Sequence, residues 1–313
     1  MKLRVAAAPH LVTRESTRTL MLDVLIALLP TTAAGIYLFG LRAAWVLCAS
    51  VVAAVVSEFL WQKLMKRPVR VGDLSAVVTG LILGLNLPST VPLWIPVLGS
   101  AMAIILVKEL FGGIGHNFMN PAMFARAFLL ASFPARMIVF ALPERLLGAS
   151  QALSGVDAVA SATPLVMQGN WSYMDLLLGN IPGTIGEVSK IAILIGFLYL
   201  LFVGTIRWEI PVLFAGSTAL LSWIVGADPL AAVLSGGVLF GAVFMATDYA
   251  TSPVYTAGKC IYAIGCGIMV VVIRQYGNYP EGVTFAILLM NCVTPLLDRF
   301  TVRRVYGTVK KHA

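Results

Sequence analysis

One threonine in a long polar loop is the side chain of this sequence best suited to accept a covalent group. Thr163 follows Ser161 and Ala162, precedes Pro164, and lies a few residues after Asp157. Small neighbours leave its hydroxyl open to a modifying enzyme, and the proline stiffens the chain just after it. The pattern is compatible with enzymatic modification of the hydroxyl. From the residues alone, a turn or a helix cap explains the same pattern.

Polar residues that interrupt apolar runs form a second group of side chains capable of chemistry. The segments 86–90 (NLPST) and 247–252 (TDYATS) are such interruptions, and Asp248 lies in the second. Irregular backbone at membrane depth is tolerated only where it is buried in protein or lines a wet cavity. A carboxylate there is costly unless it is paired or functional. We therefore interpret Asp248 as functional, and Asp23 and Glu58 as interfacial residues near helix ends.

The segment 112–123 (GGIGHNFMNPAM) is typical of a loop that leads into a helix. Asn120 is a good N-cap, and Pro121 suits the first helical position. Helix N-termini offer free N–H groups and the positive end of a dipole, which suit an anion or a flavin carbonyl. Asn117, Asn120 and Asp248 are thus candidate flavin or ion-pathway residues, with ordinary helix capping as the alternative for Asn120. The glycine spacing is not a dinucleotide-binding fingerprint, because no β-α-β unit surrounds it.

The composition requires that these residues be positioned by helices in a membrane. Hydrophobic residues make up 59% and charged residues 12% of the chain, against about 25% charged in a soluble domain, and the mean hydropathy is +0.91. These values exclude a soluble globule, a disordered chain and a nucleic-acid-binding domain. The 4 cysteines form no C-x-x-C pair and the 3 histidines are scattered, so we expect no metal site within the chain.

Apolar runs predict an all-α polytopic membrane protein with about ten transmembrane helices, each needing about 20 residues. The third, seventh and eighth runs are short or interrupted. The predicted spans are 20–39, 43–61, 74–88, 93–110, 121–141, 187–206, 210–225, 230–247, 257–273 and 283–298. We interpret 1–313 as a single integral membrane domain.

Basic residues in short loops predict the orientation of the chain. They gather in the N-terminal arm, in the loop at 63–70, at Arg207 and in the tail at 301–313. All of these fall on one side if there are about ten spans, so both termini are expected to be cytoplasmic. The long connection at 142–186 contains a single basic residue, Arg145. It is expected outside.

The two halves of the chain are similar to each other. Residues 73–84 (DLSAVVTGLILG) resemble residues 228–241 (DPLAAVLSGGVLFG) with two residues inserted, and a polar interruption follows each. Five spans in each half is an odd number, so the halves at 20–141 and 187–300 are predicted to be inverted repeats, an architecture in which helices are often broken near the midplane. Chance similarity between two Gly/Ala/Val-rich helices is the alternative.

Three motifs in this order resemble the NqrB/RnfD family of membrane flavoprotein subunits. They are residues 113–128 (GIGHNFMNPAMFARAF), the loop from Asp157 to Thr163, and residues 228–253 with TDYATSP at their end. The similarity covers about 20 to 300. The chain lacks the longer N-terminal region of the NqrB branch and is more similar to RnfD. The resemblance implies a fold like that of urea and ammonium channels.

The resemblance also implies the cofactors. Family members carry FMN as a phosphoester on a threonine, in a pattern that Asp157, Ser161, Ala162 and Thr163 match. The departures are Ala158, where glycine is usual, and Ala160, where serine or threonine is usual. A second flavin, a non-covalent riboflavin in the membrane interior, is implied without assigned residues.

The function implied is that of one component of a bacterial inner-membrane Rnf complex. Such a component is not catalytic alone: it relays electrons through FMN while the complex couples NADH/ferredoxin chemistry to Na⁺ or H⁺ translocation. Implied partners are the FMN-carrying RnfG protein, the membrane proteins RnfA and RnfE, a flavin transferase and lipid, with no nucleic acid. The alternatives are an NqrB-like protein that passes electrons to quinone, and a solute channel or transporter, for which the 142–186 loop has no evident use.

Overall fold

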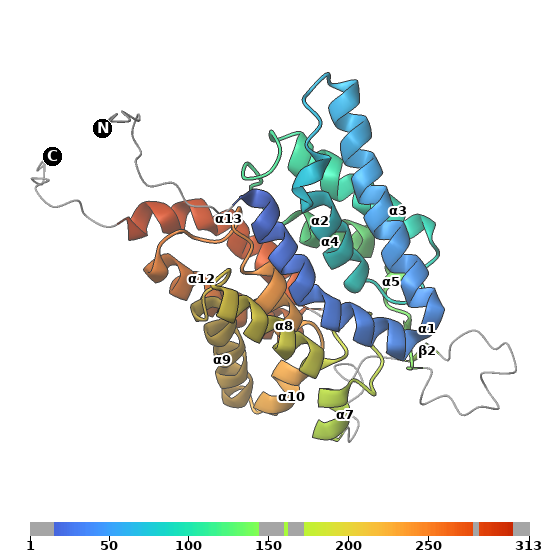
Figure 1. The fold of residues 1–313 in the computed structure, drawn as a ribbon. Helices are drawn as coiled ribbons and strands as arrows, with labels where there is room; N and C mark the ends of the chain where they lie inside the picture. The colour runs from blue at the N-terminus through green and yellow to red at the C-terminus, as the bar shows by residue number, and fades with distance from the viewer. Residues whose placement is uncertain (1–15, 144–159, 162–171, 278–281, 303–313) are drawn as a thin grey trace, which may run out of the picture.

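The computed structural model describes residues 16–143, 160–161, 172–277 and 282–302. Within these residues the regular secondary structure is helical apart from one pair of two-residue antiparallel strands (Figure 1). Helices α1, α12 and α13 are long and apolar enough to cross a membrane. The described part of the chain is therefore that of an all-α membrane protein, as its composition predicts.

The first two predicted spans are the two legs of one bent helix, α1 (Thr17–Leu64). A straight helix of 48 residues would be about 72 Å long, more than twice a bilayer core of about 30 Å. Gly40 bends it, with φ 70° and ψ −163°, values that glycine adopts without steric cost. Figure 1 shows the legs as the two arms of a V.

The rest of the first half consists of shorter helices. α1 is followed by the single turn η1 (Val71–Asp73) and by α2 (Ser75–Leu85), which ends short of the predicted residue 88. Residues 86–93 are not helical, as the NLPST interruption predicts. α3 (Trp94–Met102) then continues directly into η2 (Ala103–Glu109), a π-helical segment.

The predicted span 121–141 is wrong in its second half. α4 (Pro121–Ser132) stops where Phe133 takes an extended φ of −133°, because the residue before a proline is disfavoured in the helical region. The single turn α5 (Pro134–Met137) follows, and then strand β1 (Phe140–Ala141), which pairs with β2 (Ala160–Ser161).

The second half contains longer helices and one broken one. The short helix α7 (Tyr173–Leu178) lies near the end of the 142–186 connection. The longer helices are α8 (Lys190–Val203), α9 (Glu209–Ile224), α12 (Thr256–Tyr276) and α13 (Val283–Thr301). The predicted span 230–247 is divided at Ser235–Gly237 into α10 (Pro229–Leu234), α11 (Val238–Phe240) and the π-helical η3 (Gly241–Met245).

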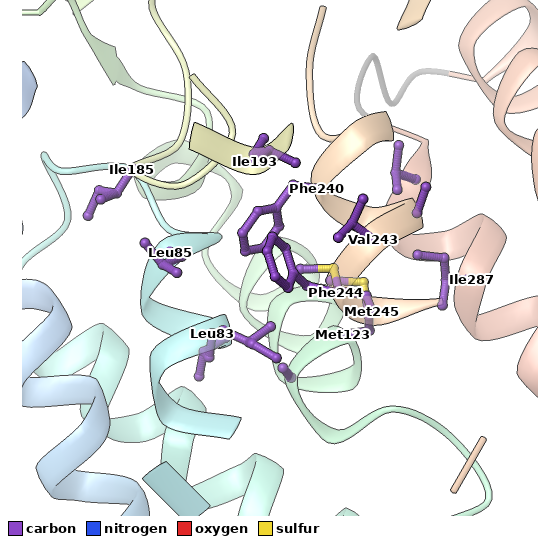
Figure 2. Packing of buried hydrophobic residues seen from close by; sticks show 14 of the residues in the cluster. Leu83, Leu85, Met123, Ile185, Ile193, Phe240, Val243, Phe244, Met245 and Ile287 are labelled. Carbon is purple, nitrogen blue, oxygen red and sulfur yellow. The ribbon is translucent and has the colours of Figure 1, made fainter. Parts of the chain in front are cut away.

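One hydrophobic core joins the two halves. Phe240, Phe244 and Met245 of the second half pack toward Leu83 and Met123 of the first (Figure 2). All five belong to the same buried cluster. The broken helix of the second half therefore contributes directly to the packing that positions α2 and α4.

Candidate functional site

The predicted attachment threonine lies outside the described residues. Thr163, Ala162 and Asp157 all fall in the ranges that the structure does not describe, and Ser161 is described as a backbone position in β2. The flavin linkage therefore stays a prediction. The anchoring of the chain on either side of Thr163 can be followed in detail.

The residues just before Thr163 are tied to the bend of α1 by a series of short contacts. Ser161 lies opposite Phe140 in the β1–β2 pair. The Thr90 hydroxyl donates to the carbonyl of Val139 at 2.6 Å, and Arg42 Nη2 donates to the carbonyl of Thr90 at 3.0 Å. In Figure 1, β2 accordingly lies near the bend of α1, at the end of the bundle away from the 63–70 turn.

The residues after Thr163 are anchored to the second half. The Tyr173 hydroxyl on α7 donates to Asp228 Oδ2 at 2.5 Å, and Asp228 also caps α10. This bond lowers the pKa of the exposed Asp228 carboxyl and raises the pKa of the Tyr173 phenol. The segment 162–171 that contains Thr163 thus connects one anchor on the first half with another on the second.

The structure brings the other three predicted site residues together. Asn117, Asn120 and Asp248 line one cavity of about 80 Å³, between α2, the loop before α4, η3 and the end of α8. Asn120 caps α4 as predicted, since its Oδ1 accepts from the N–H groups of Ala122 and Met123 at 3.0 and 3.2 Å. Its Nδ2 donates to the carbonyl of Met245 at 3.3 Å, so the cap also binds α4 to η3.

The polar groups of this cavity are only partly satisfied. Asn117 is 9% exposed, and its side-chain oxygen has no hydrogen-bond partner among the described residues. Asp248 Oδ2 accepts a bond from the Thr251 hydroxyl at 3.1 Å. An unpaired amide oxygen suits an N–H group of a ligand, but 80 Å³ is far below the roughly 300 Å³ of a typical small-molecule site. A flavin ring does not fit this cavity as folded, and the second flavin stays a prediction.

Sequence reasoning missed a buried ion pair near the centre of the fold. Arg126 on α4 donates from Nη1 to Glu187 Oε1 at 2.7 Å and to Asn86 Oδ1 at 2.8 Å. Lys190 donates to the backbone carbonyl of Glu187 and, at 3.0 Å, to that of Gly236. This network joins the interruption after α2 to the start of α8. An arginine inside an apolar run was the available signal.

A second buried ion pair corrects the interpretation of Glu58. This residue is 1% exposed and accepts from Lys108 Nζ at 2.6 Å, so it does not lie at an interface with solvent. The pair lines a cavity of about 280 Å³ near the 63–70 turn. Lys108 lies on η2, within the predicted span 93–110, where a lysine also signals a buried partner. Asp23, the other residue interpreted as interfacial, is half-buried.

Comparison with known proteins identifies the family. The profile of the NQR2, RnfD, RnfE family matches residues 4–307. The chain belongs to the NQR2, RnfD, RnfE family. The predicted resemblance is therefore confirmed over almost the whole chain.

The curated relatives are similar along nearly their entire length. The family member from Acetobacterium woodii, the D subunit of a Na⁺-translocating ferredoxin:NAD⁺ oxidoreductase complex, is 47% identical over 99% of this chain and 97% of its own. The D subunit of an ion-translocating oxidoreductase complex from Stutzerimonas stutzeri is 41% identical over 94% and 93%. The D subunit of the proton-translocating ferredoxin:NAD⁺ oxidoreductase complex from Clostridium ljungdahlii is 38% identical over 97% and 96%.

Proposed function

We propose that this chain is the D subunit of an Rnf-type ion-translocating oxidoreductase that couples ferredoxin and NAD⁺ chemistry to Na⁺ or H⁺ movement. The observation that carries the proposal is the near full-length similarity to D subunits with that activity in their names, at up to 47% identity. The chain acts within a complex, with RnfG, RnfA, RnfE, a flavin transferase and membrane lipid as partners.

We infer that FMN is held as a phosphoester on Thr163, within the pattern that Asp157, Ser161 and Ala162 complete. When bound, the flavin supplies one- and two-electron chemistry, while the protein supplies position and electrostatics. The anchors at β2 and Tyr173 support this assignment, because they fix both ends of the segment 162–171 to the helix bundle.

We infer an architecture of about ten spans in two inverted repeats, in the inner membrane with both termini cytoplasmic and Thr163 outside. The bend of α1 at Gly40 supports it by making two legs of one helix. So does the position of β2, at the end of the bundle away from the basic 63–70 turn (Figure 1). The urea- and ammonium-channel-like fold belongs to the same proposal.

The experiment is in-gel fluorescence of the chain after denaturing electrophoresis. We expect a yellow fluorescent band from cells that express the flavin transferase, and its complete loss in Thr163→Ala. Thr32→Ala is the matched control, because this hydroxyl donates to the carbonyl of Leu28 within α1 at 2.8 Å. An unlabelled wild-type band from cells with active transferase contradicts the assignment.

A further inference from the structure

The cavity beside the Glu58–Lys108 pair contains more acidic groups than a single lysine neutralises. It is lined by Glu58 and Gln62 of α1, by Lys108 and Glu109 of η2, and by Asp73. Glu58, Lys108 and Glu109 are each no more than 2% exposed. Adjacent residues of an α-helix point in different directions. In η2, which is π-helical, the adjacent residues Lys108 and Glu109 are nevertheless both buried. Such π segments are frequent at functional sites.

The Gln62 amide fixes two of these carboxylates side by side. Its Nε2 donates to Glu58 Oε1 at 3.2 Å and to Glu109 Oε1 at 3.0 Å. Its Oε1 accepts from the backbone N–H of Arg70 at 2.8 Å. Because both hydrogens of the nitrogen and the oxygen are used in this orientation, the amide is satisfied. Two glutamates are therefore held within hydrogen-bonding distance of the same nitrogen atom.

The buried part of the cluster contains fewer positive charges than negative ones. Lys108 Nζ donates to Glu58 Oε1 and to the Ser75 hydroxyl, at 2.6 and 2.5 Å. The other oxygen of Glu58, Oε2, is buried and has no hydrogen-bond partner among the described residues. Two buried carboxylates face one buried ammonium, which leaves one negative charge. A buried charge without a partner is strongly unfavourable, so this surplus calls for a cation.

The remaining charged groups lie at the margin of the cavity. Arg67 and Arg70 are exposed, and Arg67 donates to the backbone carbonyl of Glu109 at 3.2 Å rather than to its carboxylate. Asp73 Oδ1 is used by the N–H and hydroxyl of Ser75. Solvent screens the charge of the exposed arginines, so they do not replace a cation inside the cluster.

We propose that this cavity binds one monovalent metal cation, Na⁺, between the free oxygen of Glu58 and the carboxylate of Glu109. Carboxylate and water oxygens suit hard cations, and a surplus of one negative charge matches one positive charge. A volume of about 280 Å³ leaves room for water ligands. The proposal rests on the proposed function, in which the complex moves a cation.

The position of Lys108 connects this site with the rest of the protein. Lys108 and Ile114 line both the 280 Å³ cavity and the smaller one that contains Asn117, Asn120 and Asp248. Lys108 therefore lies in the wall between the two cavities. A cation that competes with Lys108 for Glu58 therefore binds where the two cavities adjoin.

The test is binding of ²²Na⁺ to the purified complex in detergent, with choline chloride to hold the ionic strength constant. Glu109→Gln keeps the bond from Gln62 and removes the surplus charge, so we expect Na⁺ affinity to fall by at least about tenfold. Lys108→Met removes the internal cation, so we expect the affinity to rise by a similar factor. Opposite shifts from two neighbouring residues are not expected of a purely structural ion pair.

Two controls separate this proposal from the proposed function. Glu209→Gln neutralises an acid outside both cavities, which pairs with Arg207 at 3.8 Å, and should leave Na⁺ binding unchanged. The fluorescence of the flavin band reports the Thr163 linkage, and size-exclusion chromatography of the purified complex reports its assembly. Wild-type Na⁺ affinity in Glu109→Gln, with the complex intact, overturns the site. So does a pair of variants that shift the dependence of activity on pH while Na⁺ binding stays the same, since the site then takes a proton.

Discussion

The two buried ion pairs of this protein are almost identical in length and differ in what surrounds them. Lys108 and Glu58 are 2.6 Å apart, and Arg126 and Glu187 are 2.7 Å apart, with every side chain less than 5% exposed. The first pair borders a cavity and a second carboxylate, Glu109. The second pair lines neither of the two described cavities. A short distance between charges thus says little by itself about whether a pair stabilises the fold or is available to a ligand.

The enclosed pair has the features of a structural lock. Arg126 Nη1 is shared between Glu187 and the Asn86 amide oxygen. Gly237 packs so closely that a Cβ there would overlap the Glu187 carboxylate. The pair beside the cavity can be rehydrated, and this difference is open to measurement.

The largest effect is expected from Arg126→Met. It leaves Glu187 buried without its partner, which costs about 3–5 kcal/mol. Unfolding in mixed detergent micelles measures the change. Lys108→Met, with the same loss of a cation, should cost less than half as much, because the adjacent cavity admits water or a cation to Glu58. Equal losses in the two variants would remove the distinction between the pairs.

Gly237→Ala tests the packing around the enclosed pair with no change in charge. The added methyl group overlaps the Glu187 carboxylate, and overpacking of this kind costs about 1–3 kcal/mol. Gly216→Ala on α9 is the matched control, since nothing lies within 4 Å of a Cβ there. Its expected effect is a stabilisation of about 0.5–1 kcal/mol from helix propensity. Unfolding of Gly237→Ala at the wild-type midpoint would show that the glycine is not a packing requirement.

Local chemistry was readable in the sequence, and long-range pairing was not. The Asn120 cap and the interruption after α2 depend on a few adjacent residues, and both were predicted. The Glu58–Lys108 pair joins residues 50 positions apart, and its formation depends on how α1 packs against η2. Charged residues within apolar runs indicate that each has a partner, but they do not identify which residue that partner is.

The predicted helix ends failed for a related reason. A span 121–141 is apolar enough, but Pro134 forces Phe133 out of the helical region and ends α4 at Ser132. The loop at 144–159 and 162–171, with Thr163, lies outside the described residues. Its assignment still depends on motif and family, while the β1–β2 and Tyr173 anchors were not visible in the sequence.

Asn120→Ala tests the helix that carries Arg126. It removes the cap of α4 and the bond to Met245, and loss of a cap costs about 0.5–2 kcal/mol. Asn120→Asp keeps the capping oxygen and loses only the donor to Met245, so it should recover most of that stability. Both effects should vanish in an Arg126→Met background if the cap acts by positioning Arg126. Full additivity in this double-mutant cycle would show that cap and lock are independent.

The smallest effect is expected at the exposed Tyr173–Asp228 bond, which sets the lower limit of the comparison. The pKa of Asp228 is below its ordinary value of 3.8 in the folded protein because the Tyr173 hydroxyl donates to the ionised carboxyl. A depressed folded pKa gives stability that is present above the unfolded pKa and lost as the pH falls through the folded one. The difference in thermal midpoint between wild type and Tyr173→Phe should therefore be constant from about pH 6 to pH 8 and shrink below pH 3.8. Because solvent competes for both groups, the difference at neutral pH should be well below that of either buried pair. A Tyr173→Phe effect as large as that of Lys108→Met would show that burial does not separate these bonds by strength.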